Sequence, residues 1–119
     1  MDNAAAYATA NGKSAAIAAF NNRSGPFVQG PDTYVYALDY TGTALALPFQ
    51  PEKIGTDFLP IKDPAGKPYT AIEIQLAKAG GGYILYQYPD PAANLTPALK
   101  ISYVRPVDDT YWIGAGIYT

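Results

Sequence analysis

The last third of the chain holds three segments that are dense in tyrosine, isoleucine and valine, at residues 83–88, 98–105 and 111–118. Such residues favour β-strands, because aromatic and β-branched side chains fit a pleated, half-buried surface. A link of only five residues, 106–110, separates the second segment from the third. A connection this short joins neighbouring strands antiparallel, since a parallel crossover needs about a dozen residues or more. This part of the chain therefore predicts antiparallel strands.

Two more strands are predicted nearer the middle of the chain. Residues 34–38 are rich in β-forming side chains, and residues 43–47 form a second short segment that ends at Pro48. Between them, residues 39–42 carry turn-forming side chains and end on glycine, which indicates a hairpin. The chain as a whole therefore predicts five strands.

Helices are predicted from composition and from the residues at their ends. Residues 3–20 are dominated by alanine, the strongest helix former, so we expect one N-terminal helix there, with Gly12 near its middle. A second helix is expected over residues 69–79, where apolar side chains recur at helical spacing. Pro68 suits its first turn, and the three glycines at 80–82 end it.

Residues 49–67 are punctuated by proline and glycine but are too apolar for a purely solvated loop. They predict a segment that folds over the sheet with short helical turns. The length of 119 residues and the mass of 12.7 kDa fit one domain over residues 1–119, and 49% hydrophobic residues exclude a disordered chain. The expected fold class is α+β.

Composition excludes several kinds of chemistry. Cysteine and histidine are both absent from the sequence. Disulfides, thiolate zinc sites, cysteine nucleophiles, Ser-His-Asp triads and imidazole acid–base catalysis are excluded with them. Eight basic against ten acidic residues give a net charge of −2 without a basic cluster, so we expect no nucleic-acid partner.

The remaining charged residues predict neither an enzyme, nor a metal site, nor a cofactor. No carboxylates or lysines are paired in the sequence as catalysis would need. Asp57, Asp63, Asp108 and Asp109 lie in or near expected turns, where aspartate accepts hydrogen bonds from its own backbone. The alanine-rich stretch is interrupted by polar residues at 11–14, so any membrane attachment is expected through segments absent from this chain.

Strand pairing predicts which side chains share a face of the sheet. With a two-residue turn at 108–109, Lys100 lies opposite Ile117 and Ser102 lies opposite Ala115. Gly114 and Gly116 then lie on the other face, together with Ile101 and Tyr103. Two glycines permit close approach of an alanine-rich helix, so we expect the N-terminal helix there.

The segment 34–38 extends this assignment. Val35 and Ala37 are expected on the helix face. Tyr34, Tyr36 and Leu38 are expected on the opposite face, together with Lys100. A shift of one residue in the turn would reverse the assignment for the last two strands.

Lys100 is the unusual residue of the predicted sheet. It lies on a mainly apolar strand face near tyrosines, and no aspartate or glutamate falls on the same strand face. A buried ammonium is costly unless an anion satisfies it, and a small carboxylate ligand would do so. The alternative is a lysine whose stem is buried and whose charge reaches solvent at the sheet edge. Tyr86 and Tyr88, which share a parity, are either ligand contacts or ordinary core pairs.

The order of these segments resembles a single Cache domain, the extracytoplasmic PAS-like sensor module of chemoreceptors and histidine kinases. The resemblance covers nearly the whole chain. It is carried by residues 12–21, 34–43, 44–48, 51–57, 62–67, 81–89, 100–104 and 112–118. Each piece alone is weak, and their common order and spacing are specific.

The resemblance implies a five-stranded antiparallel PAS-like sheet with the N-terminal helix on one face, and helices and loops over a ligand pocket on the other. Members of this kind bind small organic acids such as acetate, propionate or pyruvate. The family often has a histidine where this chain has Leu47, and a tryptophan where it has Tyr88. The predicted ligand-binding residues are Lys100, Tyr86, Tyr88, Tyr36, Ser102, Phe58 and Tyr69.

The predicted function is an extracytoplasmic sensor that recognises a small carboxylate and passes the signal to an attached signalling region. A homodimer through the N-terminal helix is a further expectation. Two alternatives remain: an exported binding protein without signalling output, and a structural or dimerising module whose pocket is filled by its own side chains.

Overall fold

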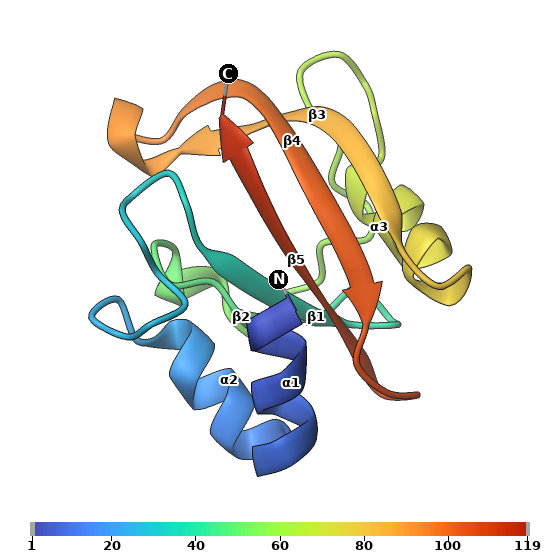
Figure 1. The fold of residues 1–119 in the computed structure, drawn as a ribbon. Coiled ribbons are helices and arrows are strands. Elements are labelled where there is room, and N and C mark those ends of the chain that lie inside the picture. Colours follow the sequence, from blue (N-terminus) through green and yellow to red (C-terminus); the bar gives the residue numbers. More distant parts are fainter. Residues whose placement is uncertain (1, 119) are drawn as a thin grey trace.

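Five antiparallel strands form a single sheet in the order β2-β1-β5-β4-β3 (Figure 1). The computed structural model describes residues 2–118. The strands are β1 (Val35–Asp39), β2 (Ala44–Ala46), β3 (Gly82–Asp90), β4 (Thr96–Pro106) and β5 (Tyr111–Tyr118). The helices are α1 (Asp2–Asn11), α2 (Lys13–Asn21) and α3 (Tyr69–Lys78), with short 3₁₀ turns at Pro51–Lys53 and Pro91–Ala93. The predicted α+β class and PAS-like sheet are confirmed.

The predicted single helix over residues 3–20 is wrong. Gly12 has a φ of 86°, in the region that favours glycine, and the chain reverses direction there. As a result α1 and α2 lie side by side as a helical hairpin in Figure 1. Within residues 2–118, no helix combines the length and the apolar character needed to cross a bilayer.

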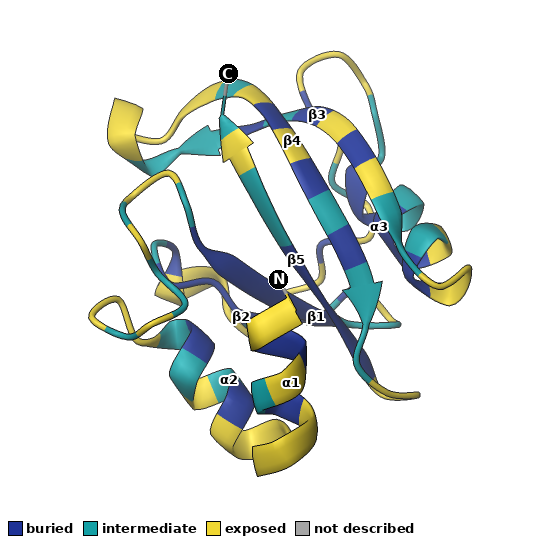
Figure 2. Cartoon of the chain, in the orientation of Figure 1, coloured by how far each residue is buried: buried dark blue, intermediate teal, exposed yellow. Residues whose placement is uncertain are grey.

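The helical hairpin covers one face of the sheet, over β1, β2 and part of β5 (Figure 2). Small side chains allow the helices to approach closely, and Phe20 fills the space between them and the sheet without any exposure. This confirms the predicted place of Val35 and Ala37. The buried members of this cluster are Ala4, Ala5, Ala8, Ala16, Phe20, Val35, Ala37, Ala46, Tyr111 and Ile113.

The predicted positions of Gly114 and Gly116 are wrong. The observed register pairs Val104 with Gly114 and Ser102 with Gly116, and it places Lys100 opposite Tyr118. The connection between β4 and β5 comprises residues 107–110, which is longer than a two-residue turn. Asp108 stabilises it by accepting hydrogen bonds from the backbone N–H groups of Thr110 and Tyr111. The register therefore moves by one residue, and both glycines share the face of Lys100.

The covering segment, residues 48–68, and α3 lie over the other face. Asp63 fastens this segment to the sheet. Its Oδ1 accepts hydrogen bonds from the N–H groups of Ala65, at 3.0 Å, and Lys67, at 2.8 Å. Its Oδ2 accepts one from the N–H of Gln87 on β3, at 3.0 Å. The carboxylate thus joins one turn of the covering segment, residues 63–67, to an edge strand.

Replacing Asp63 with alanine is expected to loosen the covering segment. These backbone hydrogen bonds lower the pKa of the Asp63 carboxyl, so the ionised form stabilises the fold. That contribution is present above the ordinary aspartate pKa of about 4 and is lost as the pH falls through the lowered value. Hydrogen exchange should show faster exchange at the Lys67 and Gln87 amides in Asp63→Ala.

Asp57→Ala is the control for this variant. The Asp57 side chain accepts a hydrogen bond from the N–H of Leu59, within the covering segment, and accepts none from the sheet among the described residues. Unchanged exchange at Gln87 in Asp63→Ala would contradict the assigned role.

Candidate functional site

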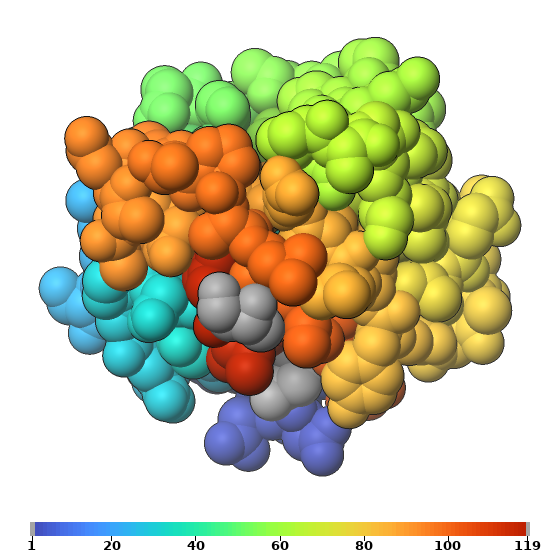
Figure 3. Space-filling model, turned by 90° about the horizontal axis from the view of Figure 1, so that it is seen from above, coloured from blue at the N-terminus to red at the C-terminus, as the bar shows by residue number. Residues whose placement is uncertain are grey.

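A small cavity lies between the sheet and its cover. Strand side chains form its floor, and side chains of α3 and the covering segment close it. It is lined by Tyr34, Tyr36, Leu38, Leu47, Phe58, Tyr69, Thr70, Glu73, Tyr86, Tyr88 and Lys100. The space open to the centre of a water molecule is about 10 Å³, which is room for about one water. Figure 3 shows the green covering segment against the orange end of the sheet, with no open channel on that face.

Lys100 is enclosed by aromatic rings. The residue is 1% exposed, so the alternative in which its charge reaches solvent is wrong. Its Nζ lies 4.6 Å from the ring centroid of Tyr34, 4.8 Å from Tyr36, 4.9 Å from Tyr88 and 5.2 Å from Tyr118. Ring faces attract cations at such distances. Within residues 2–118 Lys100 forms no ion pair, and its Nζ donates only a long 3.5 Å hydrogen bond to Tyr34 Oη.

Glu73 of α3 brings a second charged group to the cavity. It is 2% exposed, and its Oε2 accepts a hydrogen bond of 2.9 Å from Tyr36 Oη. The sequence did not predict it at this site, because Glu73 lies on a helix and not on the strand face of Lys100. The available signal was helical spacing: Glu73 lies between Tyr69 and Ala77 on the face of α3 that is buried.

Burial favours the uncharged form of both groups and shifts their pKa values accordingly. Burial raises the pKa of the Glu73 carboxyl to about 7, against the opposing effects of the Tyr36 hydrogen bond and the charge of Lys100. Burial lowers the pKa of the Lys100 ammonium to about 8, against the effect of the Glu73 charge. Burial also raises the pKa values of the Tyr36 and Tyr86 hydroxyls well above the ordinary range, so both stay protonated and can donate.

The tyrosine hydroxyls are held by one another and by polar neighbours. Tyr86 Oη lies 3.1 Å from Ser102 Oγ and 3.5 Å from Tyr36 Oη. Gln50, at the start of the covering segment, donates a hydrogen bond of 2.9 Å from Nε2 to Tyr88 Oη. The cover and the cavity are therefore connected through a polar contact as well as through packing.

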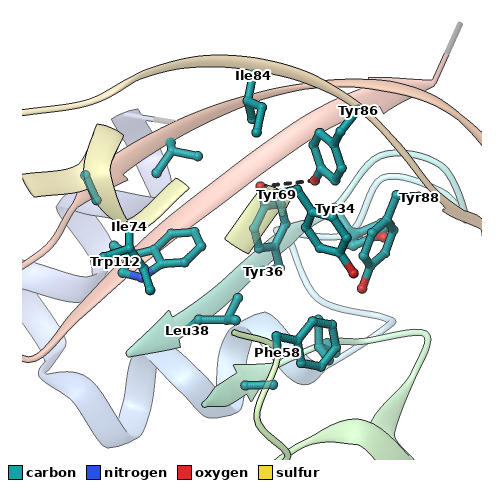
Figure 4. Close-up of a cluster of buried hydrophobic side chains, with 14 residues drawn as sticks. Tyr34, Tyr36, Leu38, Phe58, Tyr69, Ile74, Ile84, Tyr86, Tyr88 and Trp112 are labelled. Carbon is teal, nitrogen blue, oxygen red and sulfur yellow. Dashed lines mark hydrogen bonds between the residues drawn. The ribbon is translucent and has the colours of Figure 1, made fainter. Parts of the chain in front are cut away.

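Six of the seven predicted site residues come together at this cavity. Lys100, Tyr86, Tyr88, Tyr36, Phe58 and Tyr69 line it. Figure 4 shows the rings of Tyr34, Tyr36, Tyr69, Tyr86 and Tyr88 gathered from different elements. Ser102 lies behind Tyr86, fully buried, and supports its hydroxyl. Leu47 gives the wall near the covering segment an apolar side chain. The ligand contacts of these residues stay a prediction.

A PAS-like sheet that encloses an aromatic cavity with a buried lysine defines a class of small-ligand sensor domains. The sequence model of the family described as single Cache domain 2 matches residues 4–119, and the chain belongs to this family. Single Cache domains are extracytoplasmic sensor domains of membrane receptors, such as sensor histidine kinases. The predicted family is confirmed.

Among known proteins, the chain is similar to the sensor histidine kinase MctS of Rhizobium johnstonii, with 36% identity over 90 residues. This match covers 75% of the chain and 19% of the kinase, so the chain spans about a fifth of that relative.

Solved structures share the fold. A methyl-accepting chemotaxis protein from Vibrio parahaemolyticus aligns with a TM-score of 0.79 and 23% identity, over 92% of this chain and 72% of that one. A periplasmic sensor domain of a chemotaxis protein aligns at 0.78 and 24%, over 99% and 84%. A Cache chemosensory domain solved for carboxylic acid recognition aligns at 0.77 and 24%, over 99% and 82%.

Proposed function

We propose that this domain binds a short monocarboxylate, such as acetate, propionate or pyruvate, in the cavity around Lys100. The observation that carries the proposal is a fully buried ammonium that has no ion-pair partner within residues 2–118. An anion that enters the cavity would form the direct ion pair that Lys100 lacks. The carboxylic acid recognition described for one structural neighbour is consistent with this ligand class.

In this proposal each part of the cavity has a role. Lys100 binds the carboxylate, and protonated tyrosine hydroxyls donate to it. The rings and Leu47 pack against the ligand's carbon atoms. An apolar wall at Leu47, together with the small cavity, favours ligands with a short carbon chain.

Binding requires the cavity to enlarge, because about 10 Å³ does not hold a carboxylate and its carbon chain. We assign this movement to the covering segment, because it lies outside the sheet and closes the cavity. Its hydrogen bonds through Gln50 to Tyr88 and through Asp63 to β3 would have to rearrange. A ligand that binds the enlarged state better shifts the population toward it. In this proposal the domain lies outside the cytoplasm and is anchored through segments beyond this chain. It would pass the shift to a signalling region of the longer protein.

The closed cavity also favours a second candidate function. A pocket filled by its own tyrosines is what a structural or dimerising module would show.

A homodimer would need an exposed surface for the second copy, and the N-terminal helix is the predicted one. The exposed side chains of α1 and α2 are mostly alanine and polar, while large exposed apolar side chains lie on the uncovered part of the sheet. These are Tyr83, Leu85, Leu99, Ile101 and Ile117. Analytical ultracentrifugation with and without propionate would test the dimer.

A thermal-shift screen against short mono- and dicarboxylates tests the proposed function. A ligand that binds only the folded state stabilises it by about 2.7 kcal/mol at about a hundredfold excess over its Kd. We expect acetate, propionate or pyruvate to raise the melting temperature, and the corresponding primary amides, which lack the charge, to leave it unchanged. No shift with any acid would favour the structural module.

A further inference from the structure

The cavity contains two groups of opposite charge, and a bound anion would change the balance between them. The cavity is lined by one ammonium, Lys100, and one carboxyl, Glu73. If both are ionised, a bound monocarboxylate leaves the buried site with one excess negative charge. An uncompensated buried charge is expensive, and a buried acid commonly responds by binding a proton.

The geometry of Glu73 is suited to this response. Its Oε2 is held by the Tyr36 hydroxyl at 2.9 Å. Its Oε1 has no hydrogen-bond partner among residues 2–118. This oxygen is also not completely enclosed by the described part of the chain. Because the side chain borders the cavity, Oε1 is the oxygen that a bound ligand can reach.

The ionisable groups that face Glu73 come from four elements and from the residue before β1. They are Tyr34, Tyr36 of β1, Tyr69 of α3 itself, Tyr86 and Tyr88 of β3, and Lys100 of β4. Burial raises the pKa values of all five tyrosines, so they stay neutral at ordinary pH. Lys100 is the charged member of this group, and the ligand's own charge would engage it.

We propose that Glu73 takes up one proton from solvent when a monocarboxylate binds, and that the resulting carboxylic acid donates a hydrogen bond from Oε1 to the ligand. The ionised glutamate, the ligand anion and one proton become a neutral glutamic acid hydrogen-bonded to the anion, which remains paired with the Lys100 ammonium. No covalent bond other than this O–H forms or breaks. The domain thus binds an anion and a proton together. This inference rests on the proposed function.

The free protein is already poised for this change, because burial raises the pKa of Glu73 to about 7. An adjacent anion raises the pKa of a carboxyl further. Since one proton accompanies each ligand, affinity should fall as the pH rises above the pKa of Glu73 in the free protein, and more steeply above about pH 8, where Lys100 also loses its proton.

Isothermal titration of the domain with propionate tests the inference. Titrations at about pH 6 and about pH 8, in two buffers of different ionisation enthalpy, give the affinity and the number of protons taken up. We expect Glu73 to take up close to one proton per propionate at about pH 8, in addition to the partial uptake by Lys100, whose pKa is about 8, and we expect much less uptake at about pH 6. Glu73→Gln keeps the shape and the donor but cannot titrate, so its proton uptake at about pH 8 should be smaller than that of the wild type and limited to the part due to Lys100.

A second variant and a second ligand separate the alternatives. Tyr36→Phe removes the hydrogen bond that favours the ionised carboxyl, so the pH at which affinity begins to fall should move upward. L-Alanine carries its own ammonium group, so tighter binding of alanine than of propionate, lost in Glu73→Gln, would overturn the inference in favour of an ionised Glu73.

Equal proton uptake by the wild type and Glu73→Gln at about pH 8, or full loss of propionate binding in Glu73→Gln, would also overturn it. Absence of propionate binding by the wild type at every pH would contradict the proposed function itself.

Discussion

Replacing Lys100 with methionine is expected to abolish binding of short monocarboxylates while the domain still folds. Methionine fills most of the volume of the lysine stem and removes the charge. Removing one partner of a buried charge pair costs about 3–5 kcal/mol, which corresponds to at least about a hundredfold loss of affinity. Isothermal titration with propionate gives the affinity.

The stability of Lys100→Met should be maintained or raised, which separates a binding role from a structural one. In the free protein the ammonium is buried without an ion pair within residues 2–118, so its removal relieves a desolvation cost. The measurement is made at about pH 6, where Glu73 is mostly neutral because its pKa is raised to about 7. Lys62→Met, at an exposed position of the covering segment, is the control. Retained propionate affinity in Lys100→Met would contradict the proposal that Lys100 binds the carboxylate.

Most of the fold was predictable because its elements have local signals. Alternating β-forming side chains, glycine and proline placed all five strands within two residues of their observed ends. The N-terminal helix failed at Gly12, since alanine content says nothing of a φ of 86° at one residue. Helix propensity is a weak guide where one backbone angle redirects the chain.

The site was predictable where residues lie on one strand and less so where elements meet. The parity of β1 correctly placed Tyr36 in the cavity with Lys100. The parity of β5 was inverted, because the register depends on the length of one turn. Glu73 reaches the same cavity from α3. Helical spacing places it on the buried face of that helix, but no spacing within α3 shows that this face lies over Lys100. Residues contributed by separate elements need tertiary packing to be brought together.

Gly114→Ala is expected to be a strongly disruptive single-methyl change at the site. A Cβ at Gly114 would lie 2.3 Å from Cζ and 2.4 Å from Oη of Tyr36. Tyr36 has little room to retreat, because its Oη is bonded to Glu73 and its ring packs edge-on against Trp112, with centroids 6.1 Å apart. We expect the free energy of unfolding to fall by about 2–3 kcal/mol, as for other overpacked cores. Urea denaturation measures this change.

A double-mutant cycle shows whether the clash with Tyr36 is the cause. Tyr36→Leu removes the atoms that a Cβ at Gly114 would meet, so adding Gly114→Ala in that background should cost much less than in the wild type. Gly25→Ala is the matched control, because its Cβ would come no closer than 3.2 Å to another atom and its φ is ordinary. An equal cost of Gly114→Ala in both backgrounds would place the cause in the backbone of β5. A cost that disappears with Tyr36 would show that glycine is required on the cavity side of the sheet, where it gives the Tyr36 ring the room to reach Glu73.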